Sequence, residues 1–351
     1  MVEAEEQLVE YLHSFDGKTS FPRITCCNSS RSLYCGKCCH LLVPDDVLPD
    51  PISLRKEILN RGGDDCEIIS PDIAEKRQRP LKLPFNLHIV LDDRRYSATG
   101  LHAVALLDNG DGVTENDLGA VKLIDIANGD DVPEYHSIDQ TTRAPPEEDN
   151  SSIDVIEQSE TVFLLFPVPG ESIAIEEVAD QIDTLVVLDC KWTKSSLCRK
   201  NTKLSNLKKV HLSNPPTNSY YWRWHNAGPG CVSTIEAIYY AAMEVSVQEY
   251  LHMITSNDKS TNAVKDHLID QSNLVHLLWL FGHQRAATIQ AASRDGKPAP
   301  GSDEGKELAR SLRKQTGEYA WRSERNKEVG KILKAECRIL RQARRERQDL
   351  G

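Results

Sequence analysis

Two continuous apolar runs, separated by a segment of helical periodicity, constrain the fold of this chain most strongly. The runs are Thr161–Phe166 and residues 184–189, with the sequences TVFLLF and TLVVLD. Apolar runs without a polar face are typical of strands buried on both faces of a parallel sheet. Residues 172–182, between them, repeat apolar side chains at helical spacing and carry acids near the start. This β, α, β order predicts an α/β fold with a parallel sheet and helices on both faces.

Further elements extend this prediction in both directions along the chain. Alternating apolar residues predict a strand over Phe85–Leu91, and residues 208–214 predict a short one. Residues 97–107 have the apolar density of a strand, but Gly100 near their start leaves a buried helical turn as the alternative. Apolar side chains at helical spacing predict three helices, over residues 1–15, 232–255 and 271–293.

Composition divides the chain into several parts. They are an N-terminal helix in residues 1–20, a cysteine-rich unit in 21–48, a main domain in 80–290 and a basic polar tail in 293–351. Within the main domain, residues 108–152 are rich in Asp, Gly, Asn and Pro, so we interpret them as an acidic surface insertion. A chain of 351 residues with 39% hydrophobic side chains is long enough for two units.

The charge distribution leaves nucleic acid open as a partner. The formal net charge is -11, but acids concentrate between Asp108 and Asp149, whereas the tail is strongly basic. Its RILRQARRER segment is either a phosphate-binding or nuclear-address sequence or a solvated charged helix. No apolar run approaches the roughly 20 residues that span a bilayer, and the acidic, amphipathic start is unlike a leader. We therefore expect a nuclear or cytoplasmic protein without membrane association.

The cysteine-rich unit has the spacing of a metal site. Cys35 and Cys38 form a CxxC pair, and Cys26 and Cys27 lie a short turn upstream. Cysteines in a chain without an export signal favour thiols or metal ligands over disulfides, and this spacing indicates structural zinc. Adjacent cysteines rarely bind one ion, so Cys39, His40 or Cys66 are alternatives for the fourth ligand. Free buried thiols are the alternative to a metal site.

The ends of the two buried strands are candidate ligand-binding positions. In an open α/β sheet, ligands bind beyond the carboxyl ends of the strands. Phe166 and Pro167 end one run, and Asp189 ends the other. Downstream, STIE matches a capping box with Ser233 as the N-cap and Glu236 as its partner. This motif indicates either a well-capped helix or a helix start that binds a carboxylate.

Aromatic residues gather just before that helix. Tyr220, Tyr221, Trp222 and Trp224 surround Arg223 in the segment SYYWRWHNAGPG. Aromatic rings beside an arginine are what proteins use to bind single-stranded RNA, through base stacking and phosphate contacts. A packed aromatic corner is the alternative.

Taken together, these motifs resemble the DTW-domain family of aminocarboxypropyltransferases, and within it the eukaryotic tRNA-uridine branch. The resemblance covers most of residues 20–290. It rests on the segments CNSSRSLYCGKC, LKLPFNLHIV, FLLFPVPGES, LDCKW, YYWRWHNAGPG and VSTIEAIYY, in this order.

The resemblance implies a SPOUT-like α/β fold with a knotted C-terminal part, plus the small zinc-binding unit. It implies transfer of the 3-amino-3-carboxypropyl group from S-adenosylmethionine to N3 of a tRNA uridine, in the D-loop, and no obligate protein partner. Carried over to this sequence, the catalytic residues are Asp189 and Trp192. The implied cofactor-binding residues are Phe166, Pro167, Leu188, Asp189, Ser233, Thr234 and Glu236. The implied RNA-binding residues are Tyr221, Trp222 and Arg223, and the metal ligands are Cys26, Cys27, Cys35 and Cys38.

Two positions depart from the family pattern. Lys191 stands where the DxTW signature has threonine, and Ile24 stands where a cysteine is expected. Two other functions therefore stay open beside the tRNA transferase. One is a zinc-containing RNA-binding protein with impaired catalysis, and the other is a sibling transferase acting on ribosomal RNA.

Overall fold

The computed structural model describes the greater part of the chain. The described residues are 2–18, 21–60, 80–107, 119–133, 160–190, 197–216, 219–221, 231–255, 261–298 and 304. Their strands are β1 Ile24–Cys26, β2 Ser29–Arg31, β3 Asn86–Asp92, β4 Val121–Asp125, β5 Val162–Leu165, β6 Ile173–Ala174, β7 Thr184–Cys190 and β8 Lys208–His211. Their α-helices are α1 Val2–His13, α2 Asp50–Asn60, α4 Leu101–Leu107, α5 Ile175–Val178, α6 Leu197–Lys200, α7 Thr202–Ser205, α8 Thr234–Thr255, α9 Thr261–Asn273 and α10 Trp279–Arg294. Short 3-10 helices are η1 Asp45–Val47, η2 Arg95–Ser97, η3 Ile126–Asn128, η4 Ala179–Gln181 and η6 Leu274–Leu278.

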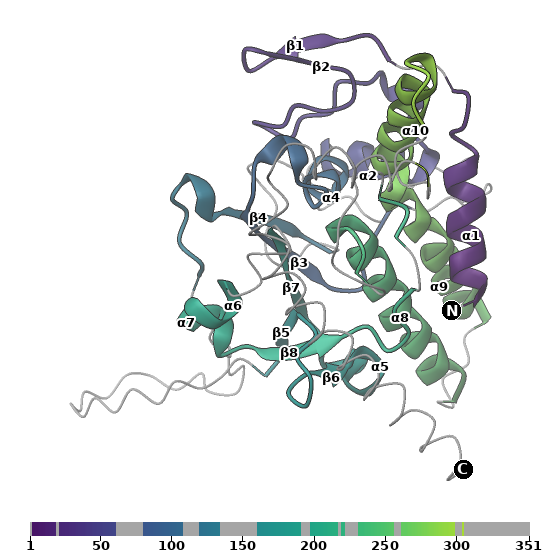
Figure 1. Ribbon diagram of the computed structural model, residues 1–351. Helices are drawn as coiled ribbons and strands as arrows, with labels where there is room; N and C mark the ends of the chain where they lie inside the picture. Colours follow the sequence, from purple (N-terminus) through teal and green to yellow (C-terminus); the bar gives the residue numbers. More distant parts are fainter. Residues whose placement is uncertain are drawn as a thin grey trace.

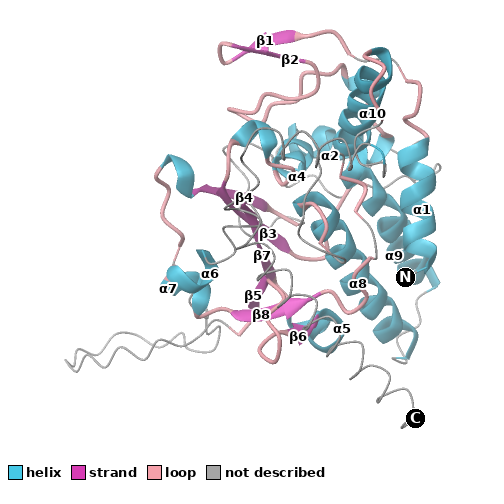
Figure 2. Ribbon diagram, viewed as in Figure 1, coloured by secondary structure: helices cyan, strands magenta, loops and turns pink. Residues whose placement is uncertain are grey.

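Six strands form one parallel sheet in the order β4-β3-β7-β5-β8-β6. Strand β7 lies between β3 and β5, and its register places Leu91 beside Asp189. Figure 2 shows the sheet between two groups of helices, with α6 and α7 on one side and α1, α8, α9 and α10 on the other. The predicted α/β class with a parallel sheet is confirmed.

Alternating side chains of the strands build two cores on opposite faces of the sheet. Leu87, Ile89, Leu185 and Val187 belong to the larger core, which also takes side chains from α4, α8 and η6. The smaller core lies under α6 and α7. Its buried members are Val90, Ile124, Val132, Val162, Leu164, Val186, Cys198, Leu204 and Leu207. Both faces are buried, which is why the strands read as continuous apolar runs.

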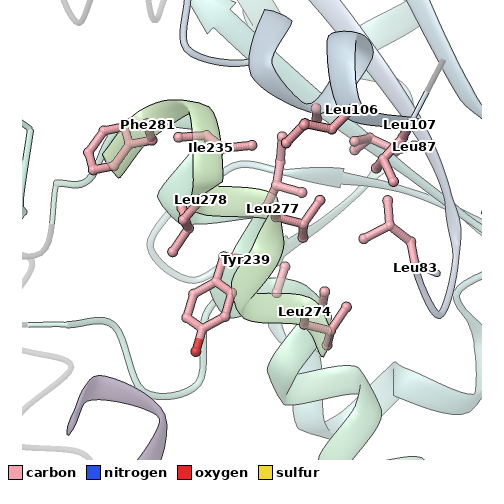
Figure 3. Packing of buried hydrophobic residues seen from close by; sticks show 14 of the residues in the cluster. Leu83, Leu87, Leu106, Leu107, Ile235, Tyr239, Leu274, Leu277, Leu278 and Phe281 are labelled. Atoms are coloured by element: carbon pink, nitrogen blue, oxygen red, sulfur yellow. The ribbon is translucent and has the colours of Figure 1, made fainter. Parts of the chain in front are cut away.

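The larger core is packed around the start of α8 and the turn η6. Figure 3 shows Tyr239 of α8 close to Leu277 and Leu278 of η6, with Leu87 of β3 and Leu106 of α4 on the sheet side. Each of these side chains is at most 3% exposed. The first three turns of α8 are therefore fixed against the sheet, and these turns carry the predicted STIE motif.

The N-terminal helix packs onto α10 through a close contact at Gly282. The predicted apolar positions Leu8, Leu12 and Phe15 are all buried. A Cβ atom at Gly282 would lie 2.5 Å from a ring atom of Phe15, so only glycine admits this ring. The Phe15 ring also meets His283 edge-on, with ring centroids 4.6 Å apart. Figure 1 shows α1 beside α9 and α10.

Several sequence predictions need correction. Residues 108–152 were interpreted as a surface insertion, but residues 121–125 within them form β4, where Ile124 is buried. Five residues with only a few apolar side chains were too short a signal inside an acidic stretch. Residues 97–107 were expected to form a strand or a buried helical turn. Residues 101–107 form helix α4, so the helical alternative is correct. The single helix predicted over 271–293 divides into the end of α9, η6 and α10. The charged segment that becomes α2 was not predicted as a helix.

Among the described residues, the helices are all too short or too polar to cross a bilayer.

The contact at Gly282 can be tested by filling it. We expect Gly282→Ala to destabilise the protein by about 1–3 kcal/mol, because the added methyl group meets the Phe15 ring. Combining it with Phe15→Leu should recover part of this loss, since the smaller side chain makes room. Urea unfolding of the two single variants and the double variant measures the coupling. Strictly additive effects would contradict the proposed contact.

Candidate active site

The candidate site lies where the connections of β3 and β7 leave the sheet in opposite directions. Strand β3 connects through α4 to β4 on one side, and β7 connects through α6 and α7 to β8 on the other. In open α/β sheets such a switch point leaves a crevice at the carboxyl ends of the strands. Asp189, near the end of β7, lies at this position.

The Asp189 carboxylate is buried among backbone and helix-start groups. It is 6% exposed and accepts a hydrogen bond of 2.5 Å from the backbone N–H of Gly100, which precedes α4. A second hydrogen bond comes from the side chain of Thr234, the first residue of α8. One carboxylate therefore joins β7, the start of α4 and the start of α8.

Burial controls the acidity of this group. Desolvation raises the pKa of Asp189 to about 6, although the hydrogen bonds from Gly100 and Thr234 lower it. The carboxyl group therefore changes charge close to neutral pH. A buried carboxyl with a raised pKa in this place is a candidate for proton transfer or for binding a cation.

Gly100 leaves the space that the carboxylate occupies. A Cβ atom at this position would lie 2.7 Å from Oδ2 of Asp189, 3.1 Å from Cγ2 of Ile89 and 3.3 Å from Cγ2 of Thr234. Any other residue would displace the carboxylate or the start of α8. The sequence reasoning did not identify Gly100 as a site residue, although a glycine between two apolar segments was a visible signal.

The start of α8 is held by the buried carboxylate of Glu236. This side chain is 0% exposed and accepts hydrogen bonds from the backbone N–H and hydroxyl of Ser233, at 2.8 and 2.6 Å. It also accepts from the Ser219 hydroxyl and the Tyr220 N–H, both at 2.7 Å. Burial raises the pKa of Glu236 although these hydrogen bonds lower it. The predicted pairing of Ser233 with Glu236 is confirmed, and it extends to the loop that carries the aromatic residues.

A neighbouring threonine completes the helix start. The hydroxyl of Thr99, buried beside Gly100, accepts a long hydrogen bond of 3.4 Å from the N–H of Ile235. The loop before α4 thus satisfies one of the free amides in the first turn of α8. Sequence reasoning did not connect these two segments, which lie 136 residues apart.

The predicted site residues lie in several places. Asp189, Ser233, Thr234 and Glu236 lie together at the start of α8. Phe166 and Leu188 are half-buried and pack against the smaller core, on the opposite face of the sheet, and Pro167 is exposed. Tyr221 is half-buried beside the larger core. The remaining predictions, at Lys191, Trp192, Trp222, Arg223 and Cys66, lie outside the described residues.

The four predicted metal ligands come together in the cysteine unit. The Sγ atoms of Cys26, Cys27, Cys35 and Cys38 all lie within 4.8 Å of one another. Tetrahedral zinc with Zn–S bonds of 2.3 Å requires sulfur atoms about 3.8 Å apart. The Sγ atom of Cys26 lies 3.6 Å from that of Cys38 and 3.9 Å from that of Cys27, so the arrangement fits zinc. Cys39, an alternative ligand, is buried in the larger core instead.

Unusual backbone conformations allow adjacent cysteines to face one ion. Cys27 and Asn28 have φ angles of 49° and 60° and form the turn between β1 and β2. Two consecutive positive φ angles are typical of a type I′ hairpin turn. The turn directs the Cys27 thiol back toward Cys26, which removes the sequence-based objection to this pair.

The cysteine unit is fastened to the carboxyl edge of the sheet by Arg95. Its Nε donates to Oδ2 of Asp125, at the end of β4, at 2.5 Å, and its Nη1 donates to the carbonyl oxygen of Lys37. Lys37 lies between the two cysteines of the CxxC pair, and its N–H and that of Cys38 stabilise the Cys35 thiolate. Although burial opposes this effect, the pKa of Cys35 falls to about 7.

A protein-family model matches part of the chain. The DTW domain family model matches residues 117–270. This chain carries a DTW domain. The DTW family is the aminocarboxypropyltransferase family, so the resemblance noted in the sequence is confirmed at that level. The matched residues contain Asp189 and the STIE motif, whereas the cysteine unit and Gly100 precede them. Neither a curated protein nor a solved structure matches the chain.

The raised pKa of Asp189 predicts an unusual dependence of stability on pH. The pKa rises from 3.8 to about 6 on folding, so the contribution of this group to stability is fully present below about pH 4 and is lost as pH rises through 6. The loss is about 3 kcal/mol at most. We expect Asp189→Asn to unfold at higher urea concentration than the wild type at pH 7.5 but not at pH 4. Asp180→Asn, at an exposed position, is the control. Equal differences at both pH values would contradict the raised pKa.

The Glu236 carboxylate predicts a large effect on stability. Glu236→Ala removes the acceptor for four hydrogen bonds, so we expect destabilisation of about 3 kcal/mol or more. Glu236→Gln should cost less because it keeps an acceptor oxygen. Thermal unfolding followed by circular dichroism measures both, with the exposed Glu177→Ala as the control. A loss no larger than that of the control would show that these hydrogen bonds are dispensable.

Proposed function

We propose that this DTW-domain protein transfers the 3-amino-3-carboxypropyl group of S-adenosylmethionine to N3 of a uridine in tRNA, in the D-loop. The observation that carries the proposal is the family match over a segment whose buried carboxylate, Asp189, lies at a sheet switch point beside a helix start. The D-loop fits because a target base must leave its stack to reach a buried carboxylate, and loop uridines do so most easily.

The reaction sets a positioning task for the protein. A bond forms between N3 of uridine and the methylene carbon next to the sulfonium, the carbon–sulfur bond breaks, and methylthioadenosine leaves with the electron pair. The N3 proton must go to a base. Since the sulfonium is already a good leaving group, most of the catalysis comes from orienting the methylene, rather than the methyl, toward N3.

Asp189 is our candidate for the base. With a pKa of about 6 it is ionised at neutral pH and can accept the N3 proton. The ionised form can also hold the ammonium group of the donor substrate. Either role needs the carboxylate at the site that Gly100 leaves open, so both depend on this glycine.

The start of α8 is our candidate for holding the donor's carboxylate. Helix-start amides and hydroxyl groups bind anions, and Ser233 and Thr234 supply both here. Glu236 holds this turn and the loop with Tyr220 in place. We assign Trp192 to packing against the adenine or the target base, and Tyr221, Trp222 and Arg223 to RNA. Phe166 and Leu188, which pack against the smaller core on the opposite face of the sheet, are left out of this assignment.

Two further proposals concern the fold and the cysteine unit. We propose a SPOUT-like fold with a knotted C-terminal part, which the insertion of β7 between β3 and β5 supports. We propose that the four clustered cysteines hold zinc as thiolates and that the ion has a structural role, because all four ligand positions are filled by the protein.

We also propose a nuclear location for the protein, because the tail of residues 293–351 is strongly basic.

A direct assay tests the function. Purified protein, S-adenosylmethionine and unmodified tRNA transcripts should produce methylthioadenosine together with tRNA whose mass increases by one aminocarboxypropyl group. We expect Gly100→Ala to lower the rate by a factor of about 100, because a misplacement of about 1 Å has this effect. The rate should increase with pH through about 6 as Asp189 ionises.

The same assay separates the alternatives. Binding of tRNA without product or measurable donor binding would favour the impaired RNA-binding protein that Lys191 suggests. In that case Lys191→Thr should restore activity. Product on ribosomal RNA but not on several tRNAs would identify the sibling transferase, and absence of product on any RNA would exclude the proposed reaction.

A further inference from the structure

The connection between β3 and α4 presents an aromatic side chain to solvent beside the candidate site. Tyr96 is 52% exposed, more than any other large hydrophobic side chain in the described part of the chain. Arg94 is also exposed, and its Nη1 donates a hydrogen bond of 2.6 Å to the Tyr96 hydroxyl. The guanidinium carbon lies 5.9 Å from the centre of the ring. A cation and an aromatic ring thus form one exposed unit.

The backbone under this pair is fastened on both sides. Arg95, between the two exposed residues, turns inward to the buried Asp125 carboxylate and the Lys37 carbonyl. Ser97 closes a turn, since its N–H and its hydroxyl both donate to the Arg94 carbonyl at 2.8 Å. A Cβ atom added at Gly36 of the CxxC pair would lie 4.0 Å from the backbone nitrogen of Tyr96, so the two segments are neighbours. The exposed ring therefore has a fixed base and loses little entropy when a ligand packs on it.

The same connection leads directly to the candidate catalytic carboxylate. Gly100, whose N–H binds Asp189, follows Tyr96 by four residues. Four residues span at most about 14 Å. The backbone of Tyr96 is therefore at most about 14 Å from Gly100, so a ligand stacked on the ring lies at the same edge of the sheet as Asp189.

The charged side chains beside the pair are of both signs. Lys37, whose carbonyl oxygen accepts from Arg95, is exposed, as is Arg94. Asp130, whose carboxylate accepts the N–H of Asp125, is exposed as well. The acids on the connection itself, Asp92 and Asp93, are half-buried, and Asp93 accepts the N–H of Arg94 at 2.7 Å. A single ring beside a cation differs from the clustered apolar anchors at the centre of protein interfaces. It matches the way in which proteins stack unpaired bases on tyrosine and arginine.

We propose that Arg94 and Tyr96 form a stacking site for an unpaired RNA base, next to the base that is modified, and that the cysteine unit flanks it with phosphate contacts. Arg94 and Tyr96 are not among the residues that the family resemblance implies for RNA binding, which are Tyr221, Trp222 and Arg223. The inference rests on the proposed function, and it names how the RNA substrate is held at the sheet edge.

Binding of a fluorescent, unmodified tRNA transcript to the full-length protein tests the proposal. We expect Tyr96→Ala to weaken binding about 5- to 100-fold, the range for loss of one base stack. Tyr96→Trp keeps a ring and should bind like the wild type. Arg94→Ala should weaken binding and lower the slope of log K against log salt by about one. Leu268→Ala and Lys265→Ala, at exposed positions on α9, are matched controls.

A fully paired RNA duplex of similar length separates stacking from charge. Tyr96→Ala should bind the duplex as the wild type does, because paired bases are not available to the ring. A tRNA containing 4-thiouridine should crosslink to Tyr96 under ultraviolet light, and mass spectrometry of the peptide identifies the residue.

Two kinds of result overturn the inference. Wild-type affinity of Tyr96→Ala for tRNA, or equal losses on tRNA and duplex, would overturn the stacking site alone, and the transferase would stand if product still forms. A wild-type protein that neither binds nor modifies any RNA would overturn both.

Discussion

The buried carboxylate of Glu236 organises the part of the structure on which the candidate site depends. Taking a carboxylate out of water is costly unless hydrogen bonds replace the lost solvent. Here four donors do so, two from Ser233 and one each from Ser219 and Tyr220. Because the donors come from both the helix start and the preceding loop, the carboxylate holds these two segments in one arrangement. The Thr234 side chain, which donates a hydrogen bond to Asp189, is thereby held in a fixed position.

The two buried carboxylates of the site, Glu236 and Asp189, differ in how many hydrogen bonds they accept. Glu236 has four hydrogen-bond donors and joins segments of the protein to each other. From the part of the chain that the structure describes, Asp189 has two, Gly100 and Thr234, and its pKa is raised to about 6. A carboxylate with remaining acceptor capacity can still bind a substrate proton or cation. The number of hydrogen-bond donors thus distinguishes the two residues. Glu236 holds segments of the protein together, whereas Asp189 is available for chemistry.

Local sequence patterns predicted much of the fold, but they did not predict the contacts between segments that are distant in the chain. The runs around Phe163 and Val186 predicted buried strands because both faces of the sheet are covered. The STIE segment predicted its own helix start, since the Ser233–Glu236 contact spans three residues. By contrast, Gly100 meets Asp189 across 89 residues, and Arg95 meets Lys37 across 58. No periodicity encodes such pairings, so neither Gly100 nor Arg95 was found. The Cys26–Cys27 pair was predicted as a ligand pair, but only the positive φ angles explain how both thiols face one point.

The central position of β7 has a consequence for how the protein folds. Its neighbours β3 and β5 precede it in the chain, so β7 must enter between two strands that are synthesised earlier. The pairing of Asn86 with Thr184 closes a long loop, and contacts of such sequence separation slow folding because chain entropy is lost before they form. The strand that carries Asp189 can therefore join β3 to β5 only after the long segment between them has been synthesised. A nascent chain that ends before residue 184 leaves the edges of β3 and β5 that face β7 unpaired, and these edges are sites for mispairing or for chaperone binding.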